Sequence, residues 1–340
     1  MARPMYIRIV CFGLFVLTQG IQLARSQEPP CISRKLPVSF RDAQNLPLQN
    51  ISAADLEAKI KGKPVKFLSL APDPRPHRIV LALDQSGSMG SIEGESPLWK
   101  LELSLAGHFF EMNRGRAQVA LLFFNDRVGN IVNLTQGNAA VGETLREAAG
   151  ERDYIKKHIK GRTALRDAIF QGVQLLDHPS SADAVYVLTD GGDNASKHSA
   201  AEVDQRLAVA SVRLFAVLLF GSGRTRNRTP EEMSGPGELA EMTRKSGGEI
   251  LTAAEWHGNS VALSANVDAK VKSEETLSRL YQTILEDRLL EIELPFPISK
   301  NERWELKLSN AARQQWKSAQ ITYPTTLIGC NSEVSGLGRH

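Results

Sequence analysis

The sequence predicts an α/β fold with a doubly wound, Rossmann-like and mostly parallel sheet covered by helices on both faces, together with a small β-rich domain. Three observations support this prediction. Strand and helix patterns alternate along most of the chain, which is typical of a parallel sheet. Several strand segments are continuously apolar, as expected of strands buried on both faces. Short strands separated by turn residues stand at both ends of the chain, outside this alternation.

Residues 1–26 have the features of a secretory signal peptide. Arg3 and Arg8 precede a short, mostly apolar stretch over residues 9–17, and residues 24–26 form a small-x-small cleavage sequence. The apolar stretch is too short to span a bilayer, which takes about 20 residues. We therefore expect a secreted or periplasmic protein with no transmembrane anchor once the signal is removed.

The charge balance gives no indication of a nucleic-acid or membrane-surface partner. The whole chain has 41 Lys plus Arg and 38 Asp plus Glu. The signal peptide contains three arginines and no acidic residue, so its removal leaves 38 of each. A formally neutral chain does not predict a basic face for nucleic acid or anionic lipid.

Two cysteines remain outside the signal peptide, Cys31 and Cys330, near opposite ends of the chain. In an oxidising compartment they can form a disulfide that ties the two ends together. The alternative is two independent thiols, because sequence does not show whether the two Cα atoms come within bonding reach.

Residues 27–72 are expected to form a small β-rich domain. Its strands are predicted at residues 36–41, 56–61 and 65–70, with a Gly-Lys-Pro turn between the last two. Three prolines then occur within six residues, and such a segment is extended and stiff. We therefore expect residues 73–77 to link two domains.

Residues 78–288 are expected to form the α/β domain. Its strands are predicted at residues 79–83, 119–124, 128–132, 185–188, 214–220 and 249–251. Its helices are predicted to begin at Ser96-Pro97 and after Thr163, and to cover residues 202–209, 237–245 and 273–288. Because Asn125-Asp126 offers a turn, we expect the strand at residues 128–132 to lie antiparallel at the sheet edge.

The pattern returns to strands after residue 288. They are predicted at residues 289–294, 304–308 and 320–323, within a C-terminal region of residues 289–328 that is followed by a tail at 329–340. A disulfide between Cys31 and Cys330 would favour packing of these strands with the N-terminal domain.

Three loops next to predicted strands or helices carry oxygen ligands. The candidate residues are Asp84, Ser86, Ser88, Thr163 and Asp190. In an open parallel sheet, loops at the carboxyl ends of neighbouring strands meet in one crevice. Carboxylate and hydroxyl oxygens suit Mg²⁺, with Mn²⁺ or Ca²⁺ as alternatives. Only two of these side chains are charged, so the ion would keep affinity for an Asp or Glu carboxylate of a partner. Each residue alone also fits an ordinary turn or helix cap.

This residue set resembles the metal-ion-dependent adhesion site of von Willebrand factor A domains, including integrin inserted domains. The resemblance covers roughly residues 77–288. It implies that Ser86 and Ser88 bind the ion directly, that Thr163 binds it directly or through water, and that Asp84 and Asp190 act mainly through waters. The strand-rich start also resembles secreted acidobacterial VWFA-related proteins, although the Tyr- and Gly-rich closing strand frequent in that family is absent here.

The resemblance implies a non-enzymatic adhesion module whose metal grips an acidic group of a protein or peptide partner. Two alternatives are a metal-independent scaffold of the cell envelope and, with less support, a metal-assisted hydrolase. The sequence has no G-x-S-x-G, S-x-x-K, H-E-x-x-H or P-loop motif. None of its seven histidines lies in the three ligand loops.

Overall fold

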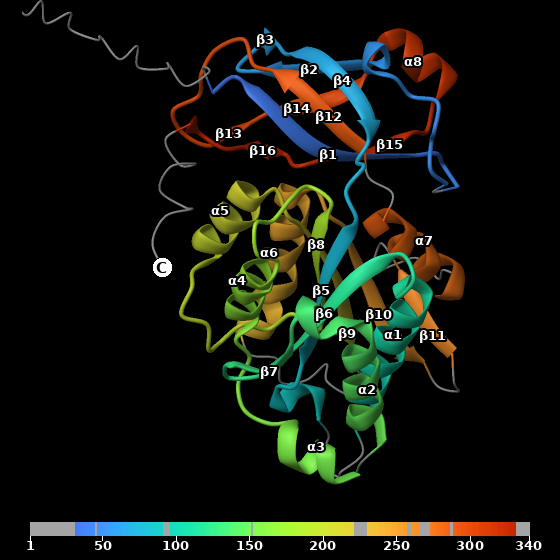
Figure 1. Cartoon of the computed structure of the whole chain (residues 1–340), viewed down its shortest axis with the longest axis vertical. Coiled ribbons are helices and arrows are strands. Elements are labelled where there is room, and N and C mark those ends of the chain that lie inside the picture. The colour runs from blue at the N-terminus through green and yellow to red at the C-terminus, as the bar shows by residue number, and fades with distance from the viewer. Residues whose placement is uncertain are drawn as a thin grey trace, which may run out of the picture.

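The structure is a computed structural model that describes residues 31–44, 46–90, 96–150, 152–220, 230–256, 260–264, 273–285 and 288–330. The predicted signal peptide and the tail from residue 331 onwards lie outside the described residues. Figure 1 shows a large α/β part below a smaller layer of antiparallel sheets. No helix in the described ranges is long and apolar enough to cross a bilayer.

A seven-stranded sheet with the order β11-β10-β9-β8-β5-β6-β7 forms the centre of the α/β part. Its strands are β5 (His77–Asp84), β6 (Ala117–Phe124), β7 (Val128–Val132), β8 (Asp183–Thr189), β9 (Arg213–Phe220), β10 (Ile250–Trp256) and β11 (Ser260–Ser264). The five inner strands are parallel. The outer strands β7 and β11 are antiparallel to their neighbours, which confirms the edge strand predicted at residues 128–132.

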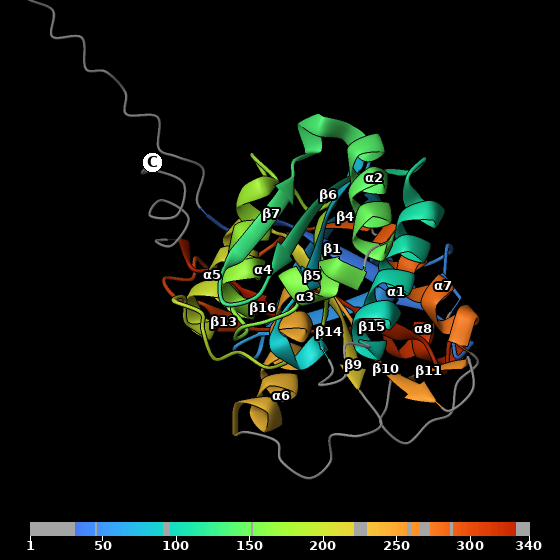
Figure 2. The ribbon, with the colours of Figure 1, turned by 90° about the horizontal axis from the view of Figure 1, so that it is seen from below.

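Helices cover both faces of this sheet, as the view in Figure 2 shows. The helices are α1 (Pro97–Asn113), α2 (Gly137–Gly150), α3 (Arg152–His158), α4 (Leu165–Leu175), α5 (Ala200–Ala210), α6 (Pro230–Ser246) and α7 (Ser273–Leu285). The core on one face joins α1, α2 and α7, and the core on the other joins α4, α5 and α6. Neighbouring residues of β5 serve different cores, since Leu81 faces the first and Ala82 the second. Burial on both faces explains the continuous apolar runs, and the predicted fold class is confirmed.

The smaller layer is built from both ends of the described chain. Its elements are η1 (Ala53–Asp55), β1 (Ser33–Arg41), β2 (Leu56–Ile60), β3 (Lys63–Pro64), β4 (Lys66–Pro72), β12 (Arg288–Glu293), β13 (Glu302–Arg303), β14 (Glu305–Leu308), α8 (Asn310–Gln315), β15 (Gln320–Thr322) and β16 (Thr326–Leu327). Strand β12 lies between β1 and β4, and β14 pairs with β2. A separate core of buried residues, which includes Val38, Ile60 and Leu290, joins the two ends. The predicted β-rich domain therefore includes the C-terminal strands.

A disulfide joins Cys31 to Cys330, whose Cα atoms lie 5.7 Å apart. It closes the layer where β1 begins and where the described chain ends. The predicted disulfide is thus present, rather than two independent thiols.

Two residues that the sequence places at domain borders belong to strands. His77, expected in the linker, begins β5, where it pairs with Ala117. Arg288, expected to end a helix, begins β12, where it pairs with Val38 and Pro72. Both differences arise because strand pairing extends a residue or more beyond the apolar stretch that marks a strand in the sequence.

Candidate metal and ligand-binding site

The candidate site lies at the carboxyl ends of β5 and β8. The chain leaves β5 through α1 to reach β6 on one side, and later enters β8 on the other side of β5. Ligands of open α/β sheets bind where the strand order reverses in this way. In Figure 1 this end of the sheet, next to α3, is remote from the antiparallel layer.

The turn that follows β5 brings Asp84, Ser86 and Ser88 together. The Ser86 backbone N–H donates to Asp84 Oδ1 at 2.8 Å. The hydroxyl oxygens of Ser86 and Ser88 are 2.8 Å apart. Asp84 and Ser86 are buried, and Ser88 is half-buried at the start of the short helix η2 (Gly87–Met89). The two serine hydroxyls therefore meet at one point beside a buried carboxylate.

Two further residues hold Asp84 in place, and the sequence did not predict either. Thr189 Oγ1 donates to Asp84 Oδ2 at 2.6 Å. Glu102 Oε1 accepts the Asp84 backbone N–H, also at 2.6 Å. The signal for Glu102 was present, because this acid lies on the buried stripe of α1 between Leu98 and Leu105, where a charged residue needs a partner.

The site concentrates negative charge. Burial, and next the negative charge of Asp190, raise the pKa of Asp84 to about 7. Burial, and next the charge of Asp84, raise the pKa of Glu102 well above its usual value. The groups that oppose these shifts donate hydrogen bonds and include no Lys or Arg. Glu102 Oε2 is buried and has no hydrogen-bond partner among the residues described. A divalent cation would relieve this repulsion, so the donor set fits such an ion.

Thr163 lies between the turn after β5 and the loop after β8. On one side, the Gly87 N–H donates to the Gly161 carbonyl at 3.0 Å. On the other side, the Thr163 N–H donates to Asn194 Oδ1 at 2.8 Å, and the Thr163 carbonyl accepts the N–H groups of Asn194 and Ala195 at 3.0 Å each. Thr163 is itself buried. The backbone thus connects all three predicted ligand loops.

The loop after β8 begins with Asp190 and then caps α4. Asp193 Oδ2 accepts the N–H of Arg166 at 2.7 Å, and Ser196 Oγ accepts the N–H of Asp167 at 3.0 Å. These bonds satisfy donors at the first turn of the helix. Asp193 and Asn194 therefore organise the loop, and Asp190 stays beside Asp84, on which its charge acts.

The donor set differs from a cluster of acids or histidines. Within the described ranges, no group of three or more His, Cys, Asp or Glu side chains is placed to hold a metal ion. The predicted ligands are instead two carboxylates and three hydroxyls, which is a donor set for a hard cation that keeps waters.

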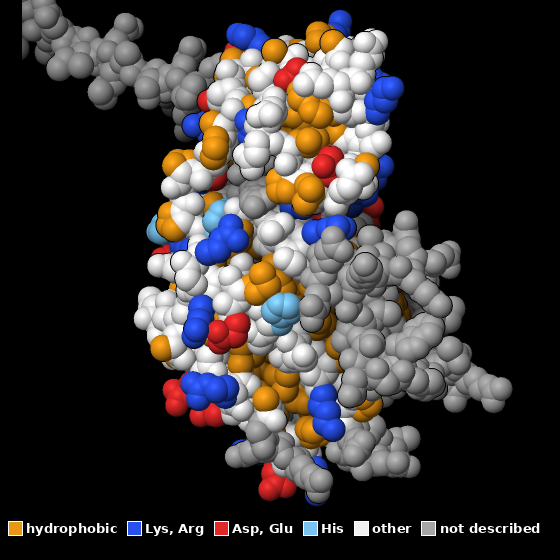
Figure 3. All heavy atoms as spheres, turned by 90° about the vertical axis from the view of Figure 1, so that its right-hand side faces the viewer, with side chains coloured by type: hydrophobic (Ala, Val, Ile, Leu, Met, Phe, Trp, Pro, Cys, Tyr) orange, Lys and Arg blue, Asp and Glu red, His pale blue; other side chains and the backbone are white. Residues whose placement is uncertain are grey.

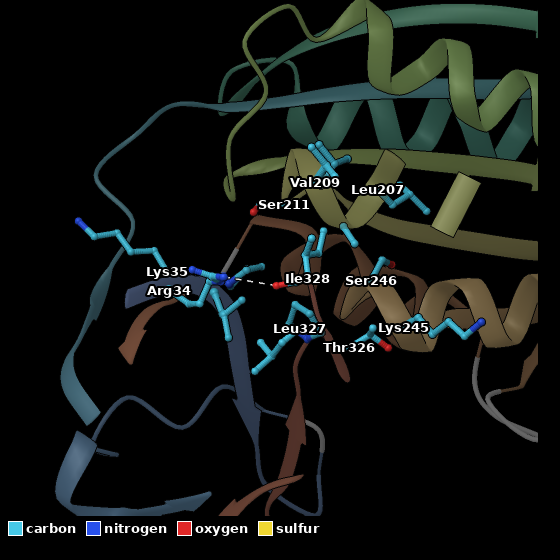
Figure 4. A pocket seen from close by; sticks show the side chains of 15 residues that line it. Arg34, Lys35, Leu207, Val209, Ser211, Lys245, Ser246, Thr326, Leu327 and Ile328 are labelled. Atoms are coloured by element: carbon cyan, nitrogen blue, oxygen red, sulfur yellow. Dashed lines mark hydrogen bonds between the residues drawn. The ribbon is translucent and has the colours of Figure 1, made fainter. Parts of the chain in front are cut away.

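A small cavity of about 70 Å³ lies elsewhere, between β1, α5, α6 and β16. Figure 4 shows its lining. Two of its three cations are already bound, because Arg34 donates to the Ile328 carbonyl at 3.3 Å and Lys245 pairs with Asp204 at 2.5 Å. This cavity is part of the seam between the two parts of the molecule.

Residues 79–192 match the family model described as the von Willebrand factor type A domain. A search of curated proteins found no match.

Several solved structures are similar at low identity. A conserved hypothetical protein, BatB from Bacteroides thetaiotaomicron, is 15% identical with a TM-score of 0.40, over 61% of this chain and 96% of that one. The PilB minor pilin from Streptococcus sanguinis is 14% identical with a TM-score of 0.38, over 62% of this chain and 61% of that one. The human COPII-coat protein Sec24c is 9% identical with a TM-score of 0.41, over 87% of this chain and 49% of that one.

Proposed function

We propose that the von Willebrand factor type A domain of this chain is a metal-dependent binding module for a protein or peptide partner. It holds one divalent cation, Mg²⁺ in preference to Mn²⁺ or Ca²⁺, and uses it to grip an Asp or Glu carboxylate. The proposed ligands are Asp84, Ser86, Ser88, Thr163 and Asp190. The observation that carries the proposal is the pair of serine hydroxyls, 2.8 Å apart, beside a buried aspartate whose pKa is raised.

The chain's own residues have distinct tasks in this proposal. Ser86 and Ser88 supply neutral oxygens, which leave more of the ion's positive charge for the partner than carboxylates would. Asp84 is oriented by Thr189 and by the Ser86 N–H, so its carboxylate cannot turn away. Thr163 is fixed by its backbone bonds to Asn194. When bound, the metal supplies the attraction for a carboxylate.

We further propose that the protein works outside the cytoplasm, either secreted or periplasmic, as a relative of the secreted VWFA-related proteins. The Cys31–Cys330 disulfide supports this location, because structural disulfides persist in oxidising compartments.

Calorimetric titration of the purified protein with Mg²⁺ and Mn²⁺ tests the proposal. We expect saturable binding by the parent protein and losses of at least tenfold in affinity for Asp84→Ala and Asp190→Ala. Glu143→Ala, which removes an exposed carboxylate on α2, is the matched control and should bind as the parent does. Circular dichroism checks that each variant is folded.

The same titration decides against the proposal if all four proteins bind the ions equally or not at all. Partner capture that survives EDTA would favour the metal-independent scaffold. Hydrolytic activity that disappears in Asp84→Ala would favour a metal-assisted hydrolase.

A further inference from the structure

Exposed cations surround one side of the candidate site. They are Arg127, Lys156, Lys157, Lys160 and Arg162, and we call them the basic collar. They come from the turn after β6, from α3 and from the loop between α3 and α4. The acidic residues in these segments are Asp126 and Asp153, so positive charge predominates.

The collar is bonded directly to the turn that carries the predicted ligands. The Lys160 N–H donates to the Gln85 carbonyl at 2.9 Å. Gln85 Nε2 donates to the Tyr154 hydroxyl of α3 at 2.8 Å. With the bond from Gly87 to Gly161, these contacts hold Lys160 and the exposed Arg162 next to Ser86 and Ser88.

The turn after β6 brings Arg127 to the same place. The Gln85 N–H donates to the Phe124 carbonyl, and the Ala164 N–H donates to the Asn125 carbonyl, both at 2.6 Å. Asn125 in turn donates to the carbonyl of Arg127 at 3.0 Å. The turn that carries Arg127 is therefore bonded both to the turn after β5 and to the start of α4.

The collar's lysines are not neutralised within the part of the chain that the structure describes, where no ion pair involves Lys156, Lys157 or Lys160. Their charge acts on His158, whose pKa is lowered by burial and next by Lys157 and Lys160. Several other cations of the α/β part are paired, as Arg78 is with Asp183 at 2.6 Å. The face in Figure 3 likewise carries both signs of charge next to each other.

An ordinary structural role explains only part of the collar. Cations in the last turn of a helix interact favourably with its dipole, which accounts for Lys156 and Lys157 in α3. Lys160, Arg162 and Arg127 lie outside the helix. A concentration of one sign at a binding cleft instead attracts and selects a partner of the opposite sign.

We propose that the partner presents an acidic protein segment rather than a single carboxylate. One Asp or Glu of the segment binds at the metal, and neighbouring acids of the segment pair with the collar. This inference rests on the proposed function and adds the class of partner to it. Because the collar is exposed, its contribution falls as salt shortens the range of charge interactions, to about 10 Å at 0.1 M ionic strength.

Two synthetic peptides test this assignment, each with a central Asp, one flanked by Glu and the other by Gln. In Mg²⁺ and low salt we expect the peptide flanked by Glu to bind the full-length protein at least tenfold more tightly than the peptide flanked by Gln. This difference in affinity should shrink in 0.5 M salt. The triple variant Lys156→Gln, Lys157→Gln, Lys160→Gln should lose most of this preference, because only Arg127 and Arg162 of the collar remain. The matched control changes three exposed lysines of the antiparallel layer, Lys59→Gln, Lys63→Gln and Lys317→Gln, and should keep the preference.

The outcomes separate the collar from the metal site. Equal binding of the two peptides by the parent protein, with normal Mg²⁺ affinity, would overturn the collar assignment and leave the proposed function standing. A preference that persists in EDTA and is reduced in the triple variant would keep the collar and overturn the metal-carboxylate function. Tighter binding of a DNA oligonucleotide or of vesicles with anionic lipid, also lost in the triple variant, would overturn the assignment to an acidic protein.

Discussion

The side chain of Thr189, the last residue of β8, donates a 2.6 Å hydrogen bond to Oδ2 of Asp84, the last residue of β5. The other oxygen, Oδ1, accepts the N–H of Ser86. The two oxygens of a fully buried carboxylate are thus held from different segments, strand β8 and the turn after β5. This arrangement fixes the orientation of the first predicted ligand before any ion binds.

Replacing Thr189 with Val should therefore weaken metal binding. The variant keeps the size of the side chain and loses the hydroxyl donor. Loss of a group that orients a metal ligand typically lowers affinity about 10- to 100-fold, and we expect the lower end for Mg²⁺. Calorimetry measures the change, and Thr189→Ser, which keeps the donor, is the control. Unchanged Mg²⁺ affinity in Thr189→Val would show that this bond does not position Asp84.

Glu102 should matter for stability through one hydrogen bond. Glu102→Leu leaves the buried N–H of Asp84 without its acceptor, which costs about 1–3 kcal/mol of unfolding free energy. Glu102→Gln keeps an acceptor and should cost about 1 kcal/mol or less. Urea unfolding in EDTA measures both, with Glu143→Leu on the surface of α2 as the control for the leucine. Equal losses in the Gln and Leu variants would contradict this role.

The stabilisation by Mg²⁺ should depend on pH. In the metal-free protein the folded-state pKa of Asp84 is about 7, above the unfolded value of about 3.9. The folded state therefore binds more protons between these values, and this contribution to stability is lost as pH rises through 7. Mg²⁺ favours the ionised form, so the rise in Tm on adding Mg²⁺ should be larger at pH 8 than at pH 6.

Thermal unfolding with and without Mg²⁺ across this pH range checks the prediction. Asp84→Asn, which does not titrate, should lose both the Mg²⁺ effect and its pH dependence. If Mg²⁺ raises the Tm of the parent protein by the same amount at pH 6 and pH 8, the predicted pH dependence is wrong.

Removing the disulfide should destabilise the antiparallel layer and spare the metal site. Loss of a disulfide typically costs about 2–4 kcal/mol, and we expect this for the double variant Cys31→Ser, Cys330→Ser. Mg²⁺ affinity should stay the same, because the candidate site lies at the other end of the molecule. Urea unfolding and Mg²⁺ titration measure the two effects. A variant as stable as the oxidised parent, or one with weaker Mg²⁺ binding, would contradict the prediction.

Buried strands and strong amphipathic helices were predictable from the sequence. The run at residues 79–83 predicted β5 because both of its faces are buried against helices. Helix α2 was not predicted, since Gly137, Gly142 and Gly150 interrupt its pattern. The edge strand β11 was missed because its five residues form a strand through antiparallel pairing with β10, which the sequence pattern does not show.

The candidate site likewise has residues that the sequence predicts and residues that it does not. Asp84, Ser86 and Ser88 could be proposed from the sequence because they lie in one turn, whereas Thr189 and Glu102 act through contacts between distant segments. The basic collar was hidden by the neutral overall charge. Its members come from three segments that only the folded chain brings together.

The Cys31–Cys330 disulfide also decides how the molecule would carry a mechanical load. The cysteines are 299 residues apart in sequence, yet their Cα atoms are 5.7 Å apart. Tension applied to the backbone at these two residues would pass through the covalent cross-link and bypass everything enclosed between them. The α/β part could then hold a partner while its own strands and helices remain unstretched.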